Sequence, residues 1–229
     1  MDKKTDKRNI NSGFPIPKEH YCDQPYVIVR EDGAWVVCLT TGSGIEGDHG
    51  QHVISSISYD QGKSWTKPID IESAESPESS WVMPYLTPYG RIYAFYVYNN
   101  NNMRTVHSTD EEGFTTRVDT LGVMAYKFSD DGGESWSKER YYIPIRNFEI
   151  DNQNPYNGEV QLNSGDLFCT FRTVLGHNCH AYSRDDGKTW TPSEFMTDKP
   201  GGRPFKHPRA ANFVRKYSNG KQIEKKQCG

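Results

Sequence analysis

The sequence predicts an all-β protein built as a β-propeller of four-stranded antiparallel blades, and three copies of one turn motif are the main reason. The motif reads Ser-x-Asp-x-Gly-x-Ser/Thr-Trp and starts at Ser58, Ser129 and Ser183. Self-similarity over some tens of residues is typical of stacked or circular modules. An aromatic content of 13% and a set of 20 glycines also favour pleated sheets joined by tight turns.

Each copy of the motif is expected to close a hairpin, because a strand-like run leads into it at 52–57, 122–128 and 177–182. The Asp carboxylate can accept backbone N–H groups across the turn, and the Gly supplies a positive φ. The Trp can bury its ring between neighbouring modules. The residues expected in this structural role are Ser58, Asp60, Gly62, Trp65, Ser129, Asp131, Gly133, Trp136, Ser183, Asp185, Gly187 and Trp190.

Two more strands precede each motif, and with a short strand after it they complete one blade. They are predicted at 25–30 and 34–40, at 81–86 and 91–98, and at 159–162 and 166–172. A further strand is expected at 209–217, ending at the turn Ser218-Asn219-Gly220.

The sequence therefore predicts a propeller that stops early, with about three and a half blades where closure takes at least about four. The expected organisation is a charged extension at 1–20, a partial propeller at 21–220 and an irregular tail at 221–229. This pattern indicates a fragment or an altered reading of a longer gene. A short protein that closes by self-association is the alternative.

The overall composition names no partner. A formal charge of −3 from mixed signs gives no basic surface for nucleic acid, and no segment has the length of a membrane span. The five cysteines are scattered, and the His pairs lack the helical spacing of a zinc hydrolase, so we expect no metal and no cofactor. The charged start favours a cytoplasmic location and leaves secretion of the native protein open.

The three motifs and the blade pattern around them resemble the sialidase (neuraminidase) superfamily, whose members carry such Asp boxes on a six-bladed propeller. The resemblance covers residues 21–219. It implies retaining glycoside hydrolysis with an Asp acid/base, a Tyr nucleophile assisted by a Glu, and three Arg residues that hold the sialic acid carboxylate. Asp boxes also occur in propellers without this activity, because a fold alone does not fix a function.

The resemblance assigns the acid/base role to Asp48. In the family this Asp lies in a loop shortly before the strand that enters the first Asp box, and the Gly-rich segment 44–52 occupies that place here. The alternative is that Asp48 only forms a Gly-flanked turn, since Asp beside Gly is common in plain loops.

Arg172 takes the position of one carboxylate-binding Arg, because it closes an apolar strand after the pattern at 161–172. Glu159 is the nearest acid to the position of the assisting Glu, at a shorter spacing than the resemblance implies. Arg209 is a candidate sugar contact. The third Arg and the Tyr nucleophile would belong to blades beyond this chain.

One departure from the family bears on substrate choice. Sialidases begin the propeller with an Arg-Ile-Pro-like tripeptide, whereas this chain has Asp23-Gln24-Pro25. An Asp at that position would repel a sialate carboxylate. The departure favours a substrate other than common sialosides, or a different arrangement for holding the carboxylate. The resemblance as a whole implies an exo-acting glycosidase for sialic acid or a related sugar, with a glycoconjugate as its partner. Two alternatives stay open: a non-catalytic propeller that binds glycans or protein, and an inactive truncated product.

Overall fold

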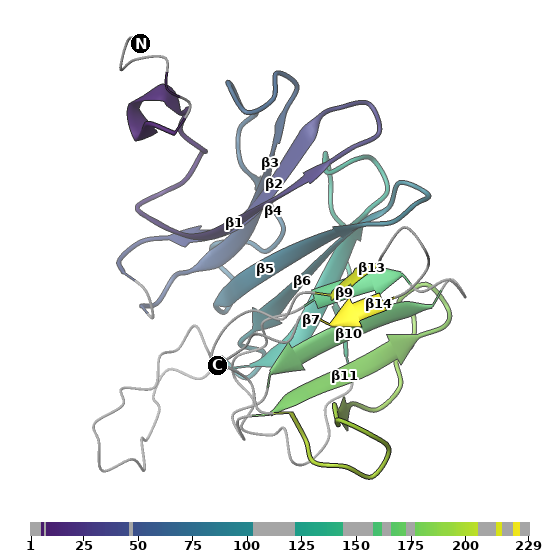
Figure 1. Ribbon diagram of the computed structural model, residues 1–229. Coiled ribbons are helices and arrows are strands. Elements are labelled where there is room, and N and C mark those ends of the chain that lie inside the picture. Colours follow the sequence, from purple (N-terminus) through teal and green to yellow (C-terminus); the bar gives the residue numbers. More distant parts are fainter. Residues whose placement is uncertain are drawn as a thin grey trace.

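The computed structural model describes residues 6, 8–45, 48–102, 122–143, 158–161, 166–172, 177–205, 214–216 and 222–224. For 158–161, 171–172, 214–216 and 222–224 it describes the backbone. Three four-stranded antiparallel sheets follow one another along the chain, and a two-stranded hairpin follows them (Figure 1).

The strands keep their sequence order within each sheet. The first blade consists of β1 (Tyr21–Val29), β2 (Trp35–Gly42), β3 (His52–Ser58) and β4 (Ile69–Asp70). The second blade consists of β5 (Ser79–Leu86), β6 (Ile92–Tyr98), β7 (Val123–Ser129) and β8 (Tyr141–Tyr142). The third blade consists of β9 (Gly158–Gln161), β10 (Leu167–Arg172), β11 (Asn178–Ser183) and β12 (Glu194–Phe195), and β13 (Val214–Lys216) pairs with β14 (Gln222–Glu224).

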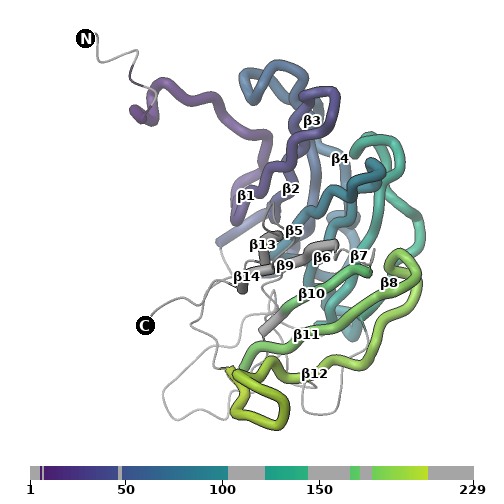
Figure 2. Tube along the Cα trace, turned by 45° about the vertical axis from the view of Figure 1, so that its right-hand side comes forward, coloured from purple at the N-terminus to yellow at the C-terminus, as the bar shows by residue number. Residues whose placement is uncertain are grey.

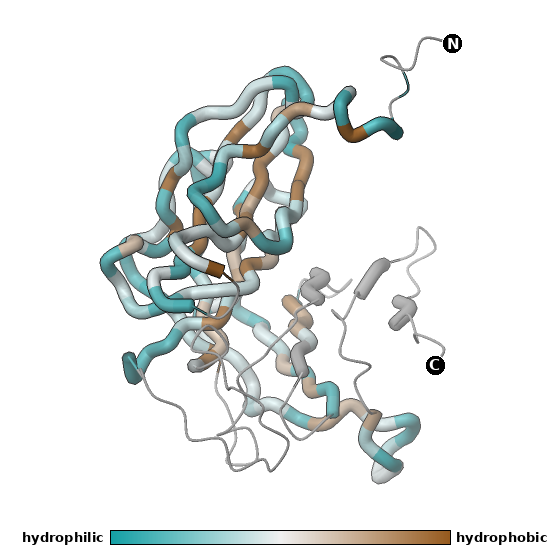
Figure 3. Tube along the Cα trace, turned by 90° about the vertical axis from the view of Figure 1, so that its left-hand side faces the viewer, coloured by the Kyte–Doolittle hydropathy of each residue, from teal (hydrophilic) through white to brown (hydrophobic). Residues whose placement is uncertain are grey.

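The prediction of an all-β fold with four-stranded antiparallel blades is confirmed. The first strands of the blades contact one another, β1 against β5, β5 against β9 and β9 against β13, as the inner strands of a propeller do. Figure 2 shows the three sheets stacked along the molecule, and Figure 3 shows hydrophobic residues on their strands and hydrophilic residues at their turns. A short 3₁₀ helix, Ile10–Ser12, precedes the first blade.

Two strand expectations differ from the structure. The sequence predicted the first strand at 25–30, whereas β1 begins at Tyr21. A bulge lies between the paired residues Asp23 and Tyr26, and it accommodates the Pro within the strand. The tail was expected to hold no strand, but Lys216 pairs with Gln222 and Val214 with Glu224. Backbone hydrogen bonds hold an antiparallel hairpin together, so a strand can form there without an apolar pattern.

The three Asp boxes share one hydrogen-bond pattern. In the first, the Asp60 carboxylate accepts the Ser58 hydroxyl at 2.8 Å, and it accepts the Ser64 backbone N–H at 2.8 Å and the Ser64 hydroxyl at 2.6 Å. The Ser58 hydroxyl oxygen also accepts the Gly62 N–H at 2.7 Å. Asp131 and Asp185 bind the corresponding groups in the other two boxes. Each Asp thus joins the two arms of its own turn.

Each later box also packs on the preceding blade. The Trp136 indole donates to the Ser55 hydroxyl of β3 at 2.9 Å, and the Trp190 ring packs edge-on against Phe95 at 6.0 Å between centroids. The box glycines lie so close to the neighbouring blade that a Cβ on Gly133 would be 3.1 Å from Val36, and one on Gly187 would be 3.1 Å from Tyr93. The turn can reach its neighbour only without a side chain at this position.

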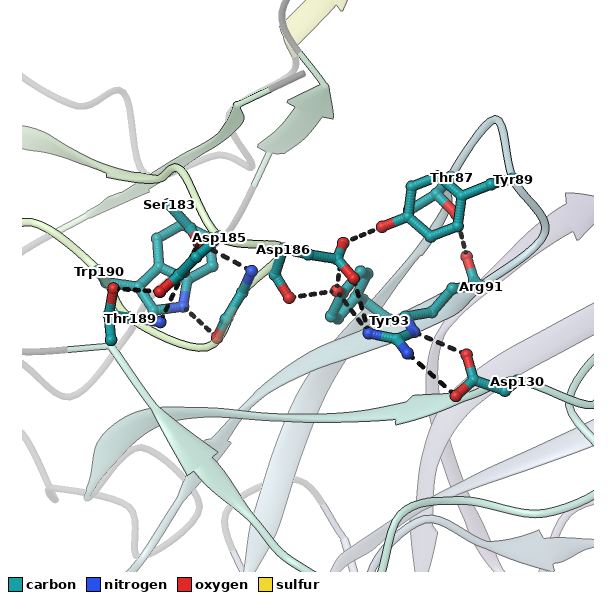
Figure 4. Close-up of polar contacts among 11 residues, drawn as sticks. Thr87, Tyr89, Arg91, Tyr93, Asp130, Ser183, Asp185, Asp186, Thr189 and Trp190 are labelled. Carbon is teal, nitrogen blue, oxygen red and sulfur yellow. Dashed lines mark hydrogen bonds and ion pairs between the residues drawn. The ribbon is translucent and has the colours of Figure 1, made fainter. Parts of the chain in front are cut away.

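Polar contacts join the same boxes to the hairpin of the preceding blade (Figure 4). Arg91 binds Asp130 through two N–O contacts of 2.6 and 3.0 Å and binds Asp186 of the third box at 2.7 Å. The Tyr93 hydroxyl donates to the Asp186 carbonyl at 2.7 Å. Between the first two blades, Arg30 donates to the Gly132 carbonyl at 3.1 Å. The bidentate contact with Asp130 lies within the second blade and fixes the direction of the Arg91 guanidinium, which then reaches Asp186 of the third blade.

The Asp boxes make the free energy of unfolding depend on pH in the acid range. Hydrogen bonds from the Ser64 hydroxyl and then its N–H lower the pKa of Asp60 to about 2, and the Ser129 and Ser135 hydroxyls lower that of Asp131 to about 2 against the opposing effect of burial. Because both values lie below the roughly 3.9 of an unfolded Asp, this stability is present above about pH 4 and is lost as the pH falls towards about 2. Urea unfolding between about pH 5 and pH 2 should show that loss. The double variant Asp60→Asn, Asp131→Asn should be less stable at neutral pH and should show a shallower loss, and an unchanged slope would contradict the assignment.

The contact between blades predicts unequal costs at two glycines with similar backbones. Gly187 has φ +77° and faces Tyr93, whereas Gly33 has φ +84° and has open space around it. Gly33→Ala should cost about 1–2 kcal/mol from left-handed backbone strain. Gly187→Ala should cost about 1–3 kcal/mol more, because the new Cβ overpacks the joint between blades. Unfolding midpoints in urea measure both, and equal losses would show that the close approach is not needed.

Candidate functional site at the end opposite the Asp boxes

The blades have two unlike ends. The three Asp boxes lie at one, which we call the box end, because boxes two and three both contact the hairpins of the preceding blades. At the other, which we call the site end, β1, β5 and β9 begin and β2, β6 and β10 end. Antiparallel pairing of Tyr21 with Gly42 and of Arg172 with Asn178 fixes this direction.

The topology brings three of the candidate residues to the site end. Asp48 lies in the connection between β2 and β3, Glu159 is the second residue of β9, and Arg172 is the last residue of β10. Glu159 pairs with Cys169, three positions before Arg172. The side chains of Glu159 and Arg172, and all of Arg209, lie outside the described residues, so their roles stay predictions.

Asp48 is exposed, and its carboxylate closes a local turn. One carboxylate oxygen accepts the Ile45 N–H at 3.1 Å, while the Asp48 N–H donates to the Ile45 carbonyl at 3.1 Å. Gln51 supports the same turn by donating its side-chain N–H to the Ile45 carbonyl at 2.9 Å. The turn fixes the carboxylate at the surface of the site end, and this geometry is compatible with both roles considered for it, acid/base and plain turn.

Behind this loop the site end holds a layer of buried polar side chains between the first two blades. Its members, all buried, are Thr40, Thr41, Gln51, His52, Glu78, Ser79, Ser80 and Asn99. The oxygens Gln51 Oε1 and Ser80 Oγ have no hydrogen-bond partner among the described residues. Buried polar groups are normally paired, so these two oxygens are exceptions within the layer.

Glu78 is the charged member of this layer, and sequence reasoning missed it. It is 2% exposed, its carboxylate accepts the Gly50 N–H and an Asn99 side-chain N–H, each at 3.2 Å, and it lies 3.4 Å from the His49 ring. Glu78 stands in a polar run between β4 and β5 that carries no motif. Its burial results from the packing of two blades, which no local pattern reports.

Asp23, which the resemblance aligned with a carboxylate-binding Arg of the family, lies in β1 at the site end and is half-buried. The backbone beside it is irregular, because Gln24 has φ +46° in the bulge. The second blade repeats this feature at the equivalent place, with Trp81 at φ +56° in the bulge between Ser80 and Met83. Positive φ in a bulky residue is strained, and such strain gathers at functional ends of folds.

A Tyr–Glu pair does occur in the described part of the chain, but it does not suit a nucleophile. The Tyr96 hydroxyl donates to Glu72, which also binds Arg140 through contacts of 2.7 and 2.6 Å and lies 3.5 Å from the Lys127 ammonium. Tyr96 is fully buried, and burial followed by the Glu72 charge raises its pKa well above the usual value. This cluster instead joins the first two blades away from solvent.

A groove of about 800 Å³ lies at the box end and not at the site end. Its lining comes from the hairpins of the first two blades and from one box, namely Val29, Arg30, Glu31, Asp32, Tyr85, Leu86, Thr87, Pro88, Gly90 and Gly132. Asp48 is not among these lining residues. The convergence of Asp48, Glu159 and Arg172 by topology therefore places the candidate site elsewhere than this groove.

Within the described ranges, no three His, Cys, Asp or Glu side chains group as metal ligands would. Nor is any described helix long and apolar enough to span a membrane.

Comparisons with known proteins agree with this architecture. The family model of the BNR repeat-like domain matches residues 16–223. A sialidase of Bacteroides fragilis (strain YCH46) is 29% identical over 197 residues, covering 80% of this chain and 32% of that protein. The chain thus spans about a third of the length of this curated relative.

Solved structures share the fold at low identity. The Hadza microbial sialidase Hz136 matches with a TM-score of 0.58 and 16% identity, over 83% of this chain and 39% of that one. The α-L-arabinanase of Penicillium chrysogenum, complexed with arabinobiose, matches with a TM-score of 0.56 and 10% identity, over 83% of this chain and 54% of that one. Glycosidases for different sugars use this fold, so it does not select the sugar. The resemblance to the sialidase superfamily is confirmed, and the chain belongs to the BNR repeat-like domain family.

Proposed function

We propose that this chain acts as a sialidase-like exo-glycoside hydrolase, which releases a terminal sugar from a glycoconjugate with Asp48 as the acid/base. One observation carries the proposal: the antiparallel topology places Asp48 at the same end of the blades as Glu159 and Arg172. Three residue types that glycosidic chemistry uses, drawn from two blades, thereby share one end. The family match supports the reaction class.

In this proposal Asp48 gives its proton to the leaving glycosidic oxygen while a nucleophile, a Tyr in the sialidase superfamily, bonds to the anomeric carbon. Asp48 then takes a proton from the water that displaces this nucleophile. Its position on a surface turn, fixed by Ile45, lets a glycoside approach without opening the core. Arg172, at the end of β10, contacts a sugar carboxylate or hydroxyl, as a guanidinium can bind either. Glu159, on the neighbouring strand β9, would take the family's role of assisting the nucleophile.

The second candidate is a non-catalytic propeller that binds glycans, and Asp23 favours it. A carboxylate at the position of a clamp Arg weakens the binding of an anionic sugar. If this candidate holds, glycan binding persists without turnover, and Asp48 serves only its turn.

Replacement of Asp48 by Asn tests the proposal. Asn keeps an acceptor for the Ile45 N–H but has no proton to donate, so turnover should fall by about 10²–10⁴-fold. The loss should be greater for 3′-sialyllactose, whose sugar leaving group needs protonation, than for 4-methylumbelliferyl N-acetylneuraminide, whose phenol leaves more easily. Rates for both substrates, with 4-methylumbelliferyl α-L-arabinofuranoside as a third probe, give the measurement.

Asp32→Asn is the matched control. Asp32 also accepts a backbone N–H in a Gly-flanked turn, from Ala34 at 3.1 Å, but it lies at the box end. This variant should keep wild-type rates. Equal rates for Asp48→Asn and the wild type would reject Asp48 as the acid/base, and sugar binding without any turnover by the wild type would favour the second candidate.

A further inference from the structure

The turn that carries Asp48 is organised around one peptide group, that of Ile45. The Ile45 N–H donates to an Asp48 carboxylate oxygen, and the Ile45 carbonyl accepts the Asp48 N–H, each at 3.1 Å. These two bonds fix the carboxylate relative to Ile45. They do not fix the turn relative to the blade, and the Ile45 side chain is 71% exposed, so its apolar packing does not hold the turn either.

Gln51 joins this turn to the blade. It stands directly before β3 and is 1% exposed, and its side-chain N–H donates to the Ile45 carbonyl at 2.9 Å. Its backbone carbonyl accepts the N–H of Ser79, the first residue of β5, at 3.1 Å. A buried residue fixed between two blades therefore holds the peptide group that holds Asp48.

The Gln51 amide can have only one orientation here. Because the Ile45 carbonyl only accepts, the amide nitrogen faces it and Oε1 lies on the other side. That oxygen is buried and has no hydrogen-bond partner among the described residues. An unpaired buried acceptor lowers stability, and an apolar side chain of the same size would have none. What the amide provides in return is the N–H for Ile45.

A glycine on the other side of the turn supports the same carboxylate. A Cβ on Gly44 would lie 3.0 Å from the Asp48 Cβ and closer still to one carboxylate oxygen. Any side chain at this position would push the carboxylate away from the Ile45 N–H. Gly44 and Gln51 thus contribute independently to one placement of Asp48.

We propose that Gln51 is the positioning residue of Asp48. The inference rests on the proposed function, since it concerns the acid/base of that reaction. Gln51 does not touch the substrate but acts through the Ile45 peptide group. Without its N–H the turn can shift on the blade, and a displacement of about 1 Å in a catalytic group can cost about 10²-fold in rate.

The first test needs no activity. Gln51→Met keeps the length of the side chain and removes both the N–H and the unpaired oxygen, so the urea midpoint should be unchanged or higher. Hydrogen exchange at the Ile45 and Asp48 N–H groups should become about two- to tenfold faster, the worth of one hydrogen bond. Unchanged exchange at both groups overturns the positioning role.

Ser55→Ala is the control for this measurement. It removes the acceptor of the Trp136 indole between the first two blades. The midpoint should therefore fall, while exchange in the turn and the rates with both sialosides should stay at the wild-type values.

The second test separates positioning from general support of the fold. With 3′-sialyllactose, Gln51→Met should lower kcat/KM about 10- to 100-fold, because this ratio includes the step in which the leaving oxygen is protonated. With 4-methylumbelliferyl N-acetylneuraminide the fall should be less than about threefold, since a phenol needs less protonation. Gln51→Leu, also without an N–H, should show the same difference between substrates.

The outcomes separate the two proposals. If the wild type turns over and Asp48→Asn does not, wild-type rates for Gln51→Met, or equal falls with both substrates, overturn the positioning role and leave the proposed function intact. If the wild type turns over none of the three glycosides, the proposed function fails and the positioning role fails with it, whereas hydrogen exchange still decides whether Gln51 holds the turn.

Discussion

The close approach between the second and third Asp-box turns and the blade before each of them is the constraint on which the structure depends. A turn that bonds its own Ser, Asp and Ser or Thr side chains is rigid, and a rigid turn can act as a fixed contact. The box glycine removes the one side chain that would separate it from Val36 or Tyr93. The Trp that follows then fills the space between two sheets. Interactions within the turn thus prepare the interaction between blades.

The two ends of the blades therefore have different roles. The box end carries the Arg91 contacts and the Trp rings, which hold blades in register. The site end is freed from that role, and it collects buried polar groups, two bulges with positive φ and an exposed carboxylate. Sites on β-sheets commonly place their reactive groups on connecting loops, while the sheets hold those loops rigidly.

Local chemistry made much of the fold predictable from the sequence. The box motif specifies a turn by itself, and strands such as Ile92–Tyr98 follow from an apolar run between turn signals. The ends of strands were harder to predict. The bulge after Asp23 lets β1 continue through Pro25, whereas the sequence prediction started the strand at that residue. The pairing of β14 depends on a partner strand and not on its own polar residues.

The candidate site divides in the same way. Asp48 and Arg172 could be named as candidates from the sequence, because a family pattern surrounds each of them. The topology then places both at one end of the blades. Glu78 and His49 were not found, because their relation joins two blades across 29 positions of sequence. Only packing turns an acid in a polar connection into a buried carboxylate under a loop.

The most direct measurement of this account is the position of a bound sugar. Crystals of the Asp48→Asn variant soaked with 3′-sialyllactose would retain the intact glycoside. We expect density at the site end, with a sugar beside residue 48. Density in the groove at the box end, against Tyr85 and Thr87, would contradict it.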